Sequence, residues 1–474
     1  MDACETTEAI AVIGQGYSGT AVALHLLRSL PAGAQLLLFE RGSRPGRGMA
    51  YGTVCDSHLL NVPAGRLGWD PADESGFVRW LAEMAPWHHS ADFVPRRLYG
   101  DYLQSHLTAA TALARARGVV VQTGLPGVRD LQRCGGQWAL RLDDGRTMNA
   151  AQVVLASGHL PPQRPSLGPD ADWSRPGLWP DPWADTGWAR LPPQADVLLL
   201  GSGLTAIDVF NQLREQGHQG HITMLSRRGL LPQPHRALEA RPRPGLSPVV
   251  ELGPDLRLRA VLRAVRVWVA QADEVDGREW RDVLASLRSC TPTLWQRLSL
   301  RDRAQFLRHL QPWWDSHRHR LAPALWQRVR AERALGRLTH YAGRVRSVVP
   351  SPLGRWHVSW QPRGGGPLLS GQVAAVINCT GPSSALRTAT EPLLQALRHR
   401  GVLQPDQLGL GLLIDEQHRP LDGSGVAAEG LFYLGPMLKA RYWEAIAVPE
   451  LRQHAAQVAA SVLGSRVIAA ALSA

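Results

Sequence analysis

Lysine is almost absent from this chain of 474 residues, in which Lys439 is the single example. The other basic residues are therefore arginines, and the net charge is +12 at pH 7. A strongly basic chain raises the question of nucleic-acid binding. The arginines are scattered along the sequence rather than gathered in one block. We therefore expect no nucleic-acid partner.

Cysteines are few and isolated, which argues against several kinds of site. The five cysteines (Cys4, Cys55, Cys134, Cys290 and Cys379) form no C-x-x-C or C-x-x-x-x-C pair. A disulfide framework, a zinc site and a redox dithiol all lose support, and we expect no metal site. Reduced, isolated thiols fit a cytoplasmic protein.

The sequence shows no export signal and no membrane span. Residues 1–5 are acidic, and no basic segment followed by an apolar stretch is visible. No apolar run reaches the roughly 18 residues that indicate a membrane-spanning helix. The nearest candidate, 458–474, is interrupted by Arg466 and predicts a terminal helix. We expect a soluble protein without a membrane partner.

What the chain does contain is a pair of glycine fingerprints. They read Gly14-Gln15-Gly16-Tyr17-Ser18-Gly19 and Gly201-Ser202-Gly203-Leu204-Thr205-Ala206. Each follows an apolar strand-like run and opens a helix-like stretch, the context in which G-x-G-x-x-G/A indicates dinucleotide binding. The first glycine permits a tight turn, the second lets the backbone approach a pyrophosphate, and the third small residue allows close helix–strand packing. The following helix N-terminus stabilises the anion. The pair predicts a protein that holds two dinucleotides and passes a hydride between them.

The pattern of strands and helices predicts an α/β protein with two Rossmann-like dinucleotide-binding domains and an inserted helical lobe. We expect an FAD-binding domain over 1–165, completed by 383–474, and an NADPH-binding domain over 194–382 with a helical insertion at about 256–338. A connector rich in proline and tryptophan, 161–193, lies between them and is a candidate linker. Its tryptophans indicate that it packs against the rest of the protein.

The residues that follow the second strand of each unit distinguish the two cofactors. Glu40 ends the strand 35–40, close to the spacing at which an acidic residue hydrogen-bonds the adenosine ribose. The corresponding strand 221–226 ends at Ser226 and is followed by Arg227 and Arg228. An NAD-specific fold usually places a carboxylate at this point. Guanidinium groups there would pair with a 2′-phosphate. These residues predict FAD in the first unit and NADPH in the second. The alternatives are that Glu40 is an ordinary surface carboxylate and that the two arginines lie on a solvated loop.

Further motifs give the chain a family resemblance. They are the stretches 48–52, 58–65, 93–99, 201–208, 226–232, 314–320, 378–382, 442–444 and 447–449. Together with the first fingerprint they resemble the bacterial YdhS-like FAD/NAD(P)-binding proteins. That group is related to class B flavin monooxygenases and to the N-hydroxylating amine monooxygenases. The resemblance covers nearly the whole chain and implies an FAD- and NADPH-dependent oxidoreductase.

The resemblance also implies which residues contact the cofactors. Asn61 falls near the reactive edge of the flavin, where it could hydrogen-bond cofactor or oxygen adduct; a helix-cap or turn asparagine is the alternative. We take Asn61 as the catalytic candidate. Beyond the residues already named, the expected cofactor contacts are Arg41, Arg47, Tyr51, Val62, Ser157, Gly158, Thr380, Gly381, Gly435 and Val448. The helix after Val448 could direct its positive end at a reduced, anionic flavin.

The expected reaction is a monooxygenation of a small molecule by O2 through a C4a-hydroperoxyflavin, with amine N-hydroxylation as the first substrate class. One departure weakens this expectation. The fingerprint F-x-G-x-x-x-H-x-x-x-W/P of flavin and Baeyer–Villiger monooxygenases is missing, and 158–162 resembles only a fragment of it. The alternatives are an NADPH-dependent flavin reductase or oxidase and a non-catalytic FAD/NADPH-binding protein. The motif His317–Arg320 either faces the active-site cleft or forms a polar helix face.

The arginines at 227 and 228 lead to a prediction about cofactor choice. We expect kcat/KM for NADPH to exceed that for NADH by at least about tenfold, because guanidinium groups pair with the 2′-phosphate that only NADPH carries. Steady-state oxidation of both nucleotides by the purified protein measures this ratio. Equal values of kcat/KM would contradict the assignment of the second site.

Overall fold

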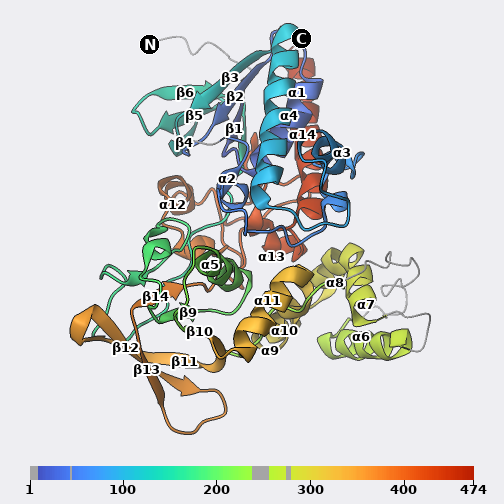
Figure 1. Cartoon of the computed structure of the whole chain (residues 1–474). Coiled ribbons are helices and arrows are strands. Elements are labelled where there is room, and N and C mark those ends of the chain that lie inside the picture. Colours follow the sequence, from blue (N-terminus) through green and yellow to red (C-terminus); the bar gives the residue numbers. More distant parts are fainter. Residues whose placement is uncertain (1–8, 43–44, 237–255, 274–278, 474) are drawn as a thin grey trace.

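A parallel sheet of five strands, in the order β15-β7-β1-β2-β3, forms the first half of the protein. The computed structural model describes residues 9–42, 45–236, 256–273 and 279–473 (Figure 1). Residues 1–5, on which the expectation of no export signal rests, therefore lie outside the described residues, and so does Cys4. The strands are β1 (Ile10–Ile13), β2 (Gln35–Phe39), β3 (Val120–Leu125), β7 (Gln152–Leu155) and β15 (Leu431–Tyr433). Every residue of β1 is buried, as expected for a central strand covered on both faces.

Long helices cover one face of this first sheet. They are α1 (Tyr17–Ser29), α4 (Arg96–Ala116) and α14 (Val448–Ser473), which lie side by side (Figure 1). The other side carries a small antiparallel sheet of β4 (Val128–Cys134), β5 (Gln137–Leu142) and β6 (Thr147–Ala150), against which α12 (Pro392–His399) packs. Short helices α2 (Gly48–Tyr51) and α3 (Gly76–Met84) lie before α4 in the chain. Residues after position 390 thus complete the unit that β1 begins.

The second sheet has seven strands in the order β13-β12-β11-β10-β9-β14-β8. They are β8 (Leu178–Trp179), β9 (Val197–Leu200), β10 (Ile222–Ser226), β11 (Leu338–Ser351), β12 (Arg355–Pro362), β13 (Leu369–Val373) and β14 (Ala375–Asn378). Strands β8 to β11 and β14 pair in parallel, whereas β12 and β13 pair antiparallel. The strand β8 belongs to the connector 161–193, which also buries Trp188 completely. This connector is therefore an integral part of the second unit.

A helical lobe lies between β10 and the rest of the second unit. It consists of α6 (Leu258–Asp273), α7 (Trp280–Ser286), α8 (Thr291–Arg297), α9 (Leu300–His309) and α10 (Gln311–Arg318), and it has its own hydrophobic core. The next helix, α11 (Pro323–Ala334), packs instead on the core of the second sheet through Leu325 and Val329. It serves as the crossover from β10 to the parallel strand β11. The end of the expected insertion at 256–338 thus belongs to the second sheet.

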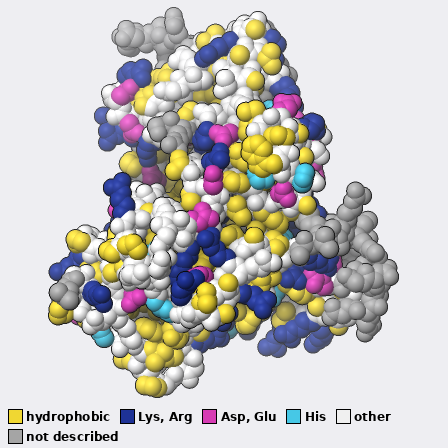
Figure 2. Space-filling model, in the orientation of Figure 1, with side chains coloured by type: hydrophobic (Ala, Val, Ile, Leu, Met, Phe, Trp, Pro, Cys, Tyr) yellow, Lys and Arg dark blue, Asp and Glu magenta, His cyan; other side chains and the backbone are white. Residues whose placement is uncertain are grey.

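The α/β fold class predicted from the sequence is confirmed by these two parallel sheets and their helices. None of the helices in the described part of the chain combines the length and apolarity that a bilayer crossing needs. Figure 2 shows arginine and lysine side chains spread over both the upper and lower parts of one face, with acidic side chains among them. Some arginines join distant segments, as Arg400 does by pairing with Asp130 on β4.

A buried ion pair fixes α11 to α5 (Leu204–Glu215) within the second unit. Arg214 Nε lies 2.6 Å from Glu332 Oε2, and their side chains are only 5% and 9% exposed. Arg337 donates a second hydrogen bond to the Glu332 carboxylate. Burial raises the pKa of Glu332, but the hydrogen bonds from Arg337 and Arg214 outweigh it and leave the pKa below its ordinary value. The pair therefore stabilises the folded state at neutral pH.

We expect Glu332→Gln to lower the free energy of unfolding at pH 7 by about 3 kcal/mol, because it leaves the buried Arg214 without a counter-ion. The matched substitution Glu215→Gln removes an exposed partner of Arg328 and should cost less than about 0.5 kcal/mol. The stabilisation by Glu332 is fully present above the ordinary pKa of 4.5 and is lost as pH falls through the lower folded value. Urea unfolding should therefore show the wild-type advantage shrinking below pH 4.5. Equal losses in the two variants would contradict the assignment.

Candidate functional site

The first glycine turn connects β1 to α1, and three of its glycines have different surroundings. Gly14 has a φ of +94°, and a Cβ there would lie 2.4 Å from the carbonyl oxygen of Ala156 at the end of β7. A Cβ on Gly19 would lie 1.8 Å from the carbonyl oxygen of Gly14. A Cβ on Gly16 would meet only Gly48, at an ordinary distance of 3.5 Å. Gly14 and Gly19 are thus required by packing, whereas Gly16 leaves room above the turn.

The second glycine turn, between β9 and α5, repeats this arrangement. Gly201 has a φ of +123°, and a Cβ there would lie 2.2 Å from the carbonyl oxygen of Cys379 at the end of β14. A Cβ on Gly203 would meet no atom within 4 Å. Ala206, at the third position, is completely buried. Leu204 and Thr205 form the first turn of α5, where backbone N–H groups have no partner within the helix. The same division of roles in both turns is what two pyrophosphate sites require.

Glu40 lies directly against the first turn. Its Oε2 accepts a hydrogen bond of 2.7 Å from the backbone N–H of Gln15, and its Oε1 accepts one of 2.9 Å from Gly42. The carboxylate is half-buried at the carboxyl end of β2. The side-chain Nε2 of Gln15 is buried without a hydrogen-bond partner among the described residues. A carboxylate and a buried amide donor beside the open space at Gly16 fit the ribose and pyrophosphate of a dinucleotide.

Aromatic residues connect the first turn to the C-terminal helix. Tyr17, the first residue of α1, stacks on Tyr99 at a centroid distance of 6.2 Å and donates a hydrogen bond of 3.4 Å to the Val448 carbonyl. Tyr51 packs edge-on against the same Tyr99 at 4.8 Å. Burial raises the pKa of Tyr51 to about 12, so its hydroxyl is neutral at physiological pH. The fold thus brings together three predicted cofactor contacts, Tyr17, Tyr51 and Val448.

The arginines predicted near the flavin have protein partners. Arg47 hydrogen-bonds Asp101 and Gln104 on α4, which fixes the start of α2. Arg41 pairs with Asp143 and Glu391 on the protein surface. These bonds tie the loop after β2 to α4 on one side and to the small antiparallel sheet on the other. In the structure both side chains position this loop.

Asn61 lies where the first unit meets the segment that follows β10. The backbone carbonyl of Asn61 accepts a hydrogen bond of 3.0 Å from His235 Nε2, and the next residue, Val62, packs on the first core. Burial, with help from the nearby Arg320, lowers the pKa of His235 to about 4. His235 is therefore neutral at pH 7, with its proton on Nε2 because a carbonyl can only accept. Sequence reasoning missed His235, because its partner is a backbone atom far away in the chain.

The predicted strand-end residues lie beside the two turns. Ser157 and Gly158 follow β7, next to Gly14, and Gly435 follows the adjacent strand β15. A Cβ on Gly435 would lie 2.7 Å from the Tyr433 hydroxyl and 3.8 Å from the Gly158 nitrogen. In the second unit, Thr380 Oγ1 donates a 2.7 Å hydrogen bond to the Asn378 side chain, and Gly381 follows with a φ of +88°. Each pair of small residues therefore adjoins a glycine turn.

The end of β10 carries the residues predicted to select NADPH. Ser202 donates a hydrogen bond of 2.8 Å to Ser226, which joins the second glycine turn to the end of β10. Arg228 donates to the backbone carbonyl of Arg308 on the lobe at 2.6 Å. Arg227 is exposed, and within the described residues it forms no ion pair or hydrogen bond. Arg227 is thus available to a 2′-phosphate, whereas Arg228 also anchors the lobe.

The structure adds a contact between the two units that sequence reasoning missed. Arg96 Nη2 at the start of α4 lies 2.8 Å from Asp208 Oδ2 on α5, and Asp208 is only 6% exposed. Asn211 Nδ2, one turn further along α5, donates a 2.9 Å hydrogen bond to the carbonyl of Ser57. Asp208 and Asn211 lie on the same buried and otherwise apolar face of α5, because residues three apart are neighbours. These two polar residues were the sequence signal from which the contact between the units could have been predicted.

The motif His317–Arg320 lies at the end of α10, where the lobe contacts the C-terminal segment. Arg318 forms a two-pronged ion pair with Glu444, with N–O distances of 3.0 and 2.9 Å. His317 Nδ1 donates to the carbonyl of Trp313 at 2.8 Å, within the same helix. Arg288 pairs with Glu450 in the first turn of α14. Arg318 of this motif therefore fastens the lobe to the segment that leads into α14.

Comparisons with known proteins agree with this architecture. Residues 11–160 match a protein-family model described as FAD-NAD(P)-binding. No curated protein matches the sequence. Similar solved structures include an ornithine N-hydroxylase from Kutzneria sp. 744, with a TM-score of 0.64, 15% identity and coverage of 97% of this chain and 100% of that one. The L-lysine 6-monooxygenase of Pseudomonas syringae gives a TM-score of 0.62 and 16% identity, covering 97% of this chain and 99% of that one.

A cadaverine monooxygenase of Erwinia amylovora is similar too, with a TM-score of 0.59, 12% identity and coverage of 97% of this chain and 94% of that one. The expected relation to FAD/NAD(P)-binding proteins is confirmed for residues 11–160. The likeness over the whole length shows that the chain has the fold of this N-hydroxylase and these monooxygenases. At these identities it is the fold that is shared.

The open glycine in each turn leads to a paired prediction. Gly203→Ala should raise KM for NADPH by at least about tenfold, because the added methyl group would occupy the space where the pyrophosphate approaches the backbone. Flavin content and the melting temperature should stay unchanged, since a Cβ at Gly203 meets no protein atom within 4 Å.

Gly16→Ala is the reciprocal control. It should weaken FAD binding by at least about tenfold and leave the NADPH dependence of the flavin-saturated protein unaltered. Flavin retention on gel filtration, NADPH titrations and thermal unfolding measure these effects. Loss of flavin in Gly203→Ala, or of NADPH affinity in Gly16→Ala, would show that the two turns are assigned the wrong way round.

Proposed function

We propose that this protein is an FAD-dependent, NADPH-consuming monooxygenase that oxygenates a small molecule, with amines as the first substrate class to test. One observation carries the proposal: both glycine turns have a packed first glycine and an open second glycine, but different residues follow the second strand. Glu40 lies at the first turn, and Arg227 is exposed near the second, with no ion pair among the described residues. A ribose-binding carboxylate and a phosphate-binding guanidinium are what FAD and NADPH respectively require.

The first unit would hold FAD. Gly16 gives the pyrophosphate access to the backbone, the N-terminus of α1 stabilises its charge, and Glu40 accepts hydrogen bonds from the ribose. The flavin end would extend toward Tyr51, Asn61, Gly158, Gly435 and Val448, which come from five separate segments of the chain. Only the folded unit brings these segments together, so we expect FAD to contribute to stability.

The second unit would hold NADPH at Gly203, with Arg227 on the 2′-phosphate. The junction of Arg96 with Asp208 fixes this unit relative to the first, so that the nicotinamide and the flavin can meet in one orientation. The structure of the Kutzneria ornithine N-hydroxylase with reduced FAD, NADP+ and L-ornithine supports the proposal that this fold can hold all three. The lysine and cadaverine enzymes act on amines as well.

When bound, FAD would supply the redox chemistry by accepting a hydride from NADPH and activating O2. The residues of this chain would bind and orient the cofactors and the substrate, and they would exclude water. The Asn61 side chain would hydrogen-bond at the reactive edge, while neutral His235 holds its backbone in place. A neutral imidazole places no additional positive charge there at pH 7. The isolated thiols of the chain support a cytoplasmic location.

The test is the fate of the electrons from NADPH. Purified, FAD-loaded protein should be yellow and oxidise NADPH, and a substrate amine should stimulate that oxidation and yield an oxygenated product by mass spectrometry. A panel of diamines and basic amino acids samples the proposed class. Hydrogen peroxide in amounts equal to the NADPH consumed, without oxygenated product for any amine, would identify an oxidase or reductase instead. The missing monooxygenase fingerprint around His159 makes that the second candidate. A protein without flavin affinity would contradict every enzymatic interpretation.

Asn61→Ala separates oxygenation from flavin reduction. We expect the variant to keep its flavin and its rate of reduction by NADPH within about twofold, since the bond to His235 uses the backbone. The yield of oxygenated product per NADPH should fall at least about tenfold, as is typical when one hydrogen-bond partner at a reacting centre is removed. Asn149→Ala, on β6 of the small sheet, is the matched control and should change neither quantity. An unchanged product yield in Asn61→Ala would remove Asn61 from the catalytic site.

A further inference from the structure

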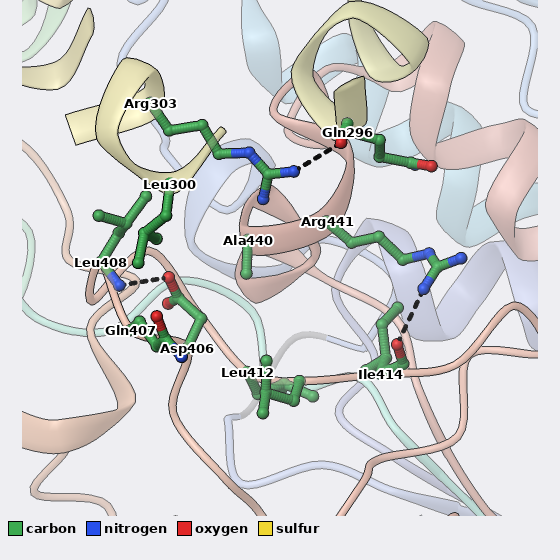
Figure 3. A pocket seen from close by; sticks show the side chains of 11 residues that line it. Gln296, Leu300, Arg303, Asp406, Gln407, Leu408, Leu412, Ile414, Ala440 and Arg441 are labelled. Carbon is green, nitrogen blue, oxygen red and sulfur yellow. Dashed lines mark hydrogen bonds between the residues drawn. The ribbon is translucent and has the colours of Figure 1, made fainter. Parts of the chain in front are cut away.

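A pocket with a volume of about 460 Å³ opens where the lobe meets the C-terminal part of the chain (Figure 3). Its walls come from α8 and α9 of the lobe, from the loop 406–414, and from α13 (Lys439–Tyr442). None of the residues predicted to hold the dinucleotides lines it. The volume lies within the range of small-molecule binding sites. This cavity is therefore a candidate site separate from the two glycine turns.

The wall of the pocket is largely apolar. Leu408, Leu412 and Ile414 line it from the loop side, and Leu300 from α9. Leu300 is 48% exposed and Leu413, also in the wall, is 40% exposed, although both are large apolar side chains. A cluster of leucines at the mouth of a cavity offers apolar area that a ligand chain would remove from water.

Two guanidinium groups line the same pocket, that of Arg303 from α9 of the lobe and that of Arg441 from α13 (Figure 3). Arg303 is held in place because its Nε donates to the Leu298 carbonyl at 3.0 Å and its Nη2 to the Gln296 carbonyl at 2.9 Å. Its guanidinium also lies 5.3 Å from the centre of the Trp295 ring. No ion pair of Arg303 occurs within the described part of the chain. Burial lowers the pKa of Arg303, and the nearby Asp406 carboxylate offsets this lowering only in part.

The other charged residues of the pocket already have partners. Asp406 accepts hydrogen bonds from the backbone N–H groups of Leu408, Leu410 and Gly411, at 2.8, 2.6 and 2.8 Å. Its carboxylate thus shapes the loop. Its charge offsets only part of the effect of burial on Arg303, with which it forms no ion pair. Arg441 donates to the Ile414 carbonyl and pairs at 3.1 Å with Glu416, whose side chain is 86% exposed. The pocket therefore combines an apolar wall with one fixed cation that has no ion-pair partner in the described part of the chain.

We propose that this pocket binds an amphipathic carboxylate, with its apolar chain against Leu300 and Leu412 and its carboxylate on Arg303. A cation would be repelled by Arg303 and Arg441. A neutral apolar ligand would desolvate the Arg303 guanidinium without giving it a partner. A carboxylate accepts from the remaining N–H donors of Arg303 in the planar geometry that guanidinium groups favour. The site goes beyond the proposed oxidoreductase activity and does not depend on it.

Isothermal titration of octanoate into the full-length, FAD-saturated protein tests the proposal, with 1-octanol as the uncharged control of equal chain length. We expect saturable binding of one octanoate, at least tenfold tighter than 1-octanol, which corresponds to about 1.4 kcal/mol. Arg303→Gln should weaken octanoate binding at least tenfold, whereas Arg303→Lys, which keeps the charge, should stay within about fivefold. Arg301→Gln, an exposed arginine on the same helix, should stay within about twofold.

Because Arg303 also holds two backbone carbonyls, Leu300→Asn provides an independent test at an exposed position. It should weaken octanoate binding at least about threefold, since it removes part of the apolar wall. Equal affinity for octanoate and 1-octanol, unchanged binding in Arg303→Gln and Leu300→Asn, or no saturable binding would overturn the proposal. Competition between octanoate and NADPH would also overturn it, by placing the ligand in the nucleotide groove.

Discussion

The contact between α4 and α5 is the interaction on which the arrangement of the two nucleotide units depends. Arg96 and Asp208 lie 2.8 Å apart with little exposure to solvent, and Asn211 adds a hydrogen bond to Ser57 nearby. A buried charge that loses its partner is costly, so this pair tolerates few alternative positions of the two units. Hydride transfer between two bound cofactors needs such a fixed geometry, because small displacements of the reacting atoms slow a reaction severely.

The lobe and the C-terminal segment depend on the same principle. Arg318 binds Glu444 and Arg288 binds Glu450, so the lobe is fastened on both sides of the turn that leads into α14. Trp443, in that turn, adopts a φ of +58°, which is uncommon for a residue other than glycine, and it packs on Trp295 at 4.7 Å. The lobe thus helps to set where α14 begins, and Val448 at that start contacts Tyr17 of the first glycine turn. The pocket beside Arg303 lies in the same seam, between lobe and α13.

Local patterns were enough to predict the parts of the fold that repeat. The strands around residues 10–13 and 35–39, the helix that starts at Tyr17 and the strand ending at Ser226 all lie where the alternation of apolar runs and glycine turns predicted them. Glycine roles were predictable for the same reason, since a turn between a strand and a helix imposes its geometry within a few residues. The connector 161–193 was harder to interpret, because β8 becomes a strand only by pairing with β14. Likewise, α11 cannot be distinguished from the lobe helices by its sequence, and only its packing on the second sheet shows its role as a crossover.

The sequence by itself determined that this protein has two dinucleotide-type turns, that an acid follows one and arginines follow the other, and that a helical segment interrupts the second unit. These are properties of short segments, in which backbone geometry and side-chain chemistry are set by neighbours in the chain. Only the tertiary structure decided that His235 supports Asn61, that Asp208 faces Arg96, and that Arg228 contacts the lobe through the Arg308 carbonyl. It also decided that Arg303 lies beside a wall of leucines without an ion-pair partner among the described residues. The physical reason is the same in each case: the partners are far apart in sequence, and which charge is paired and which is free follows from packing alone.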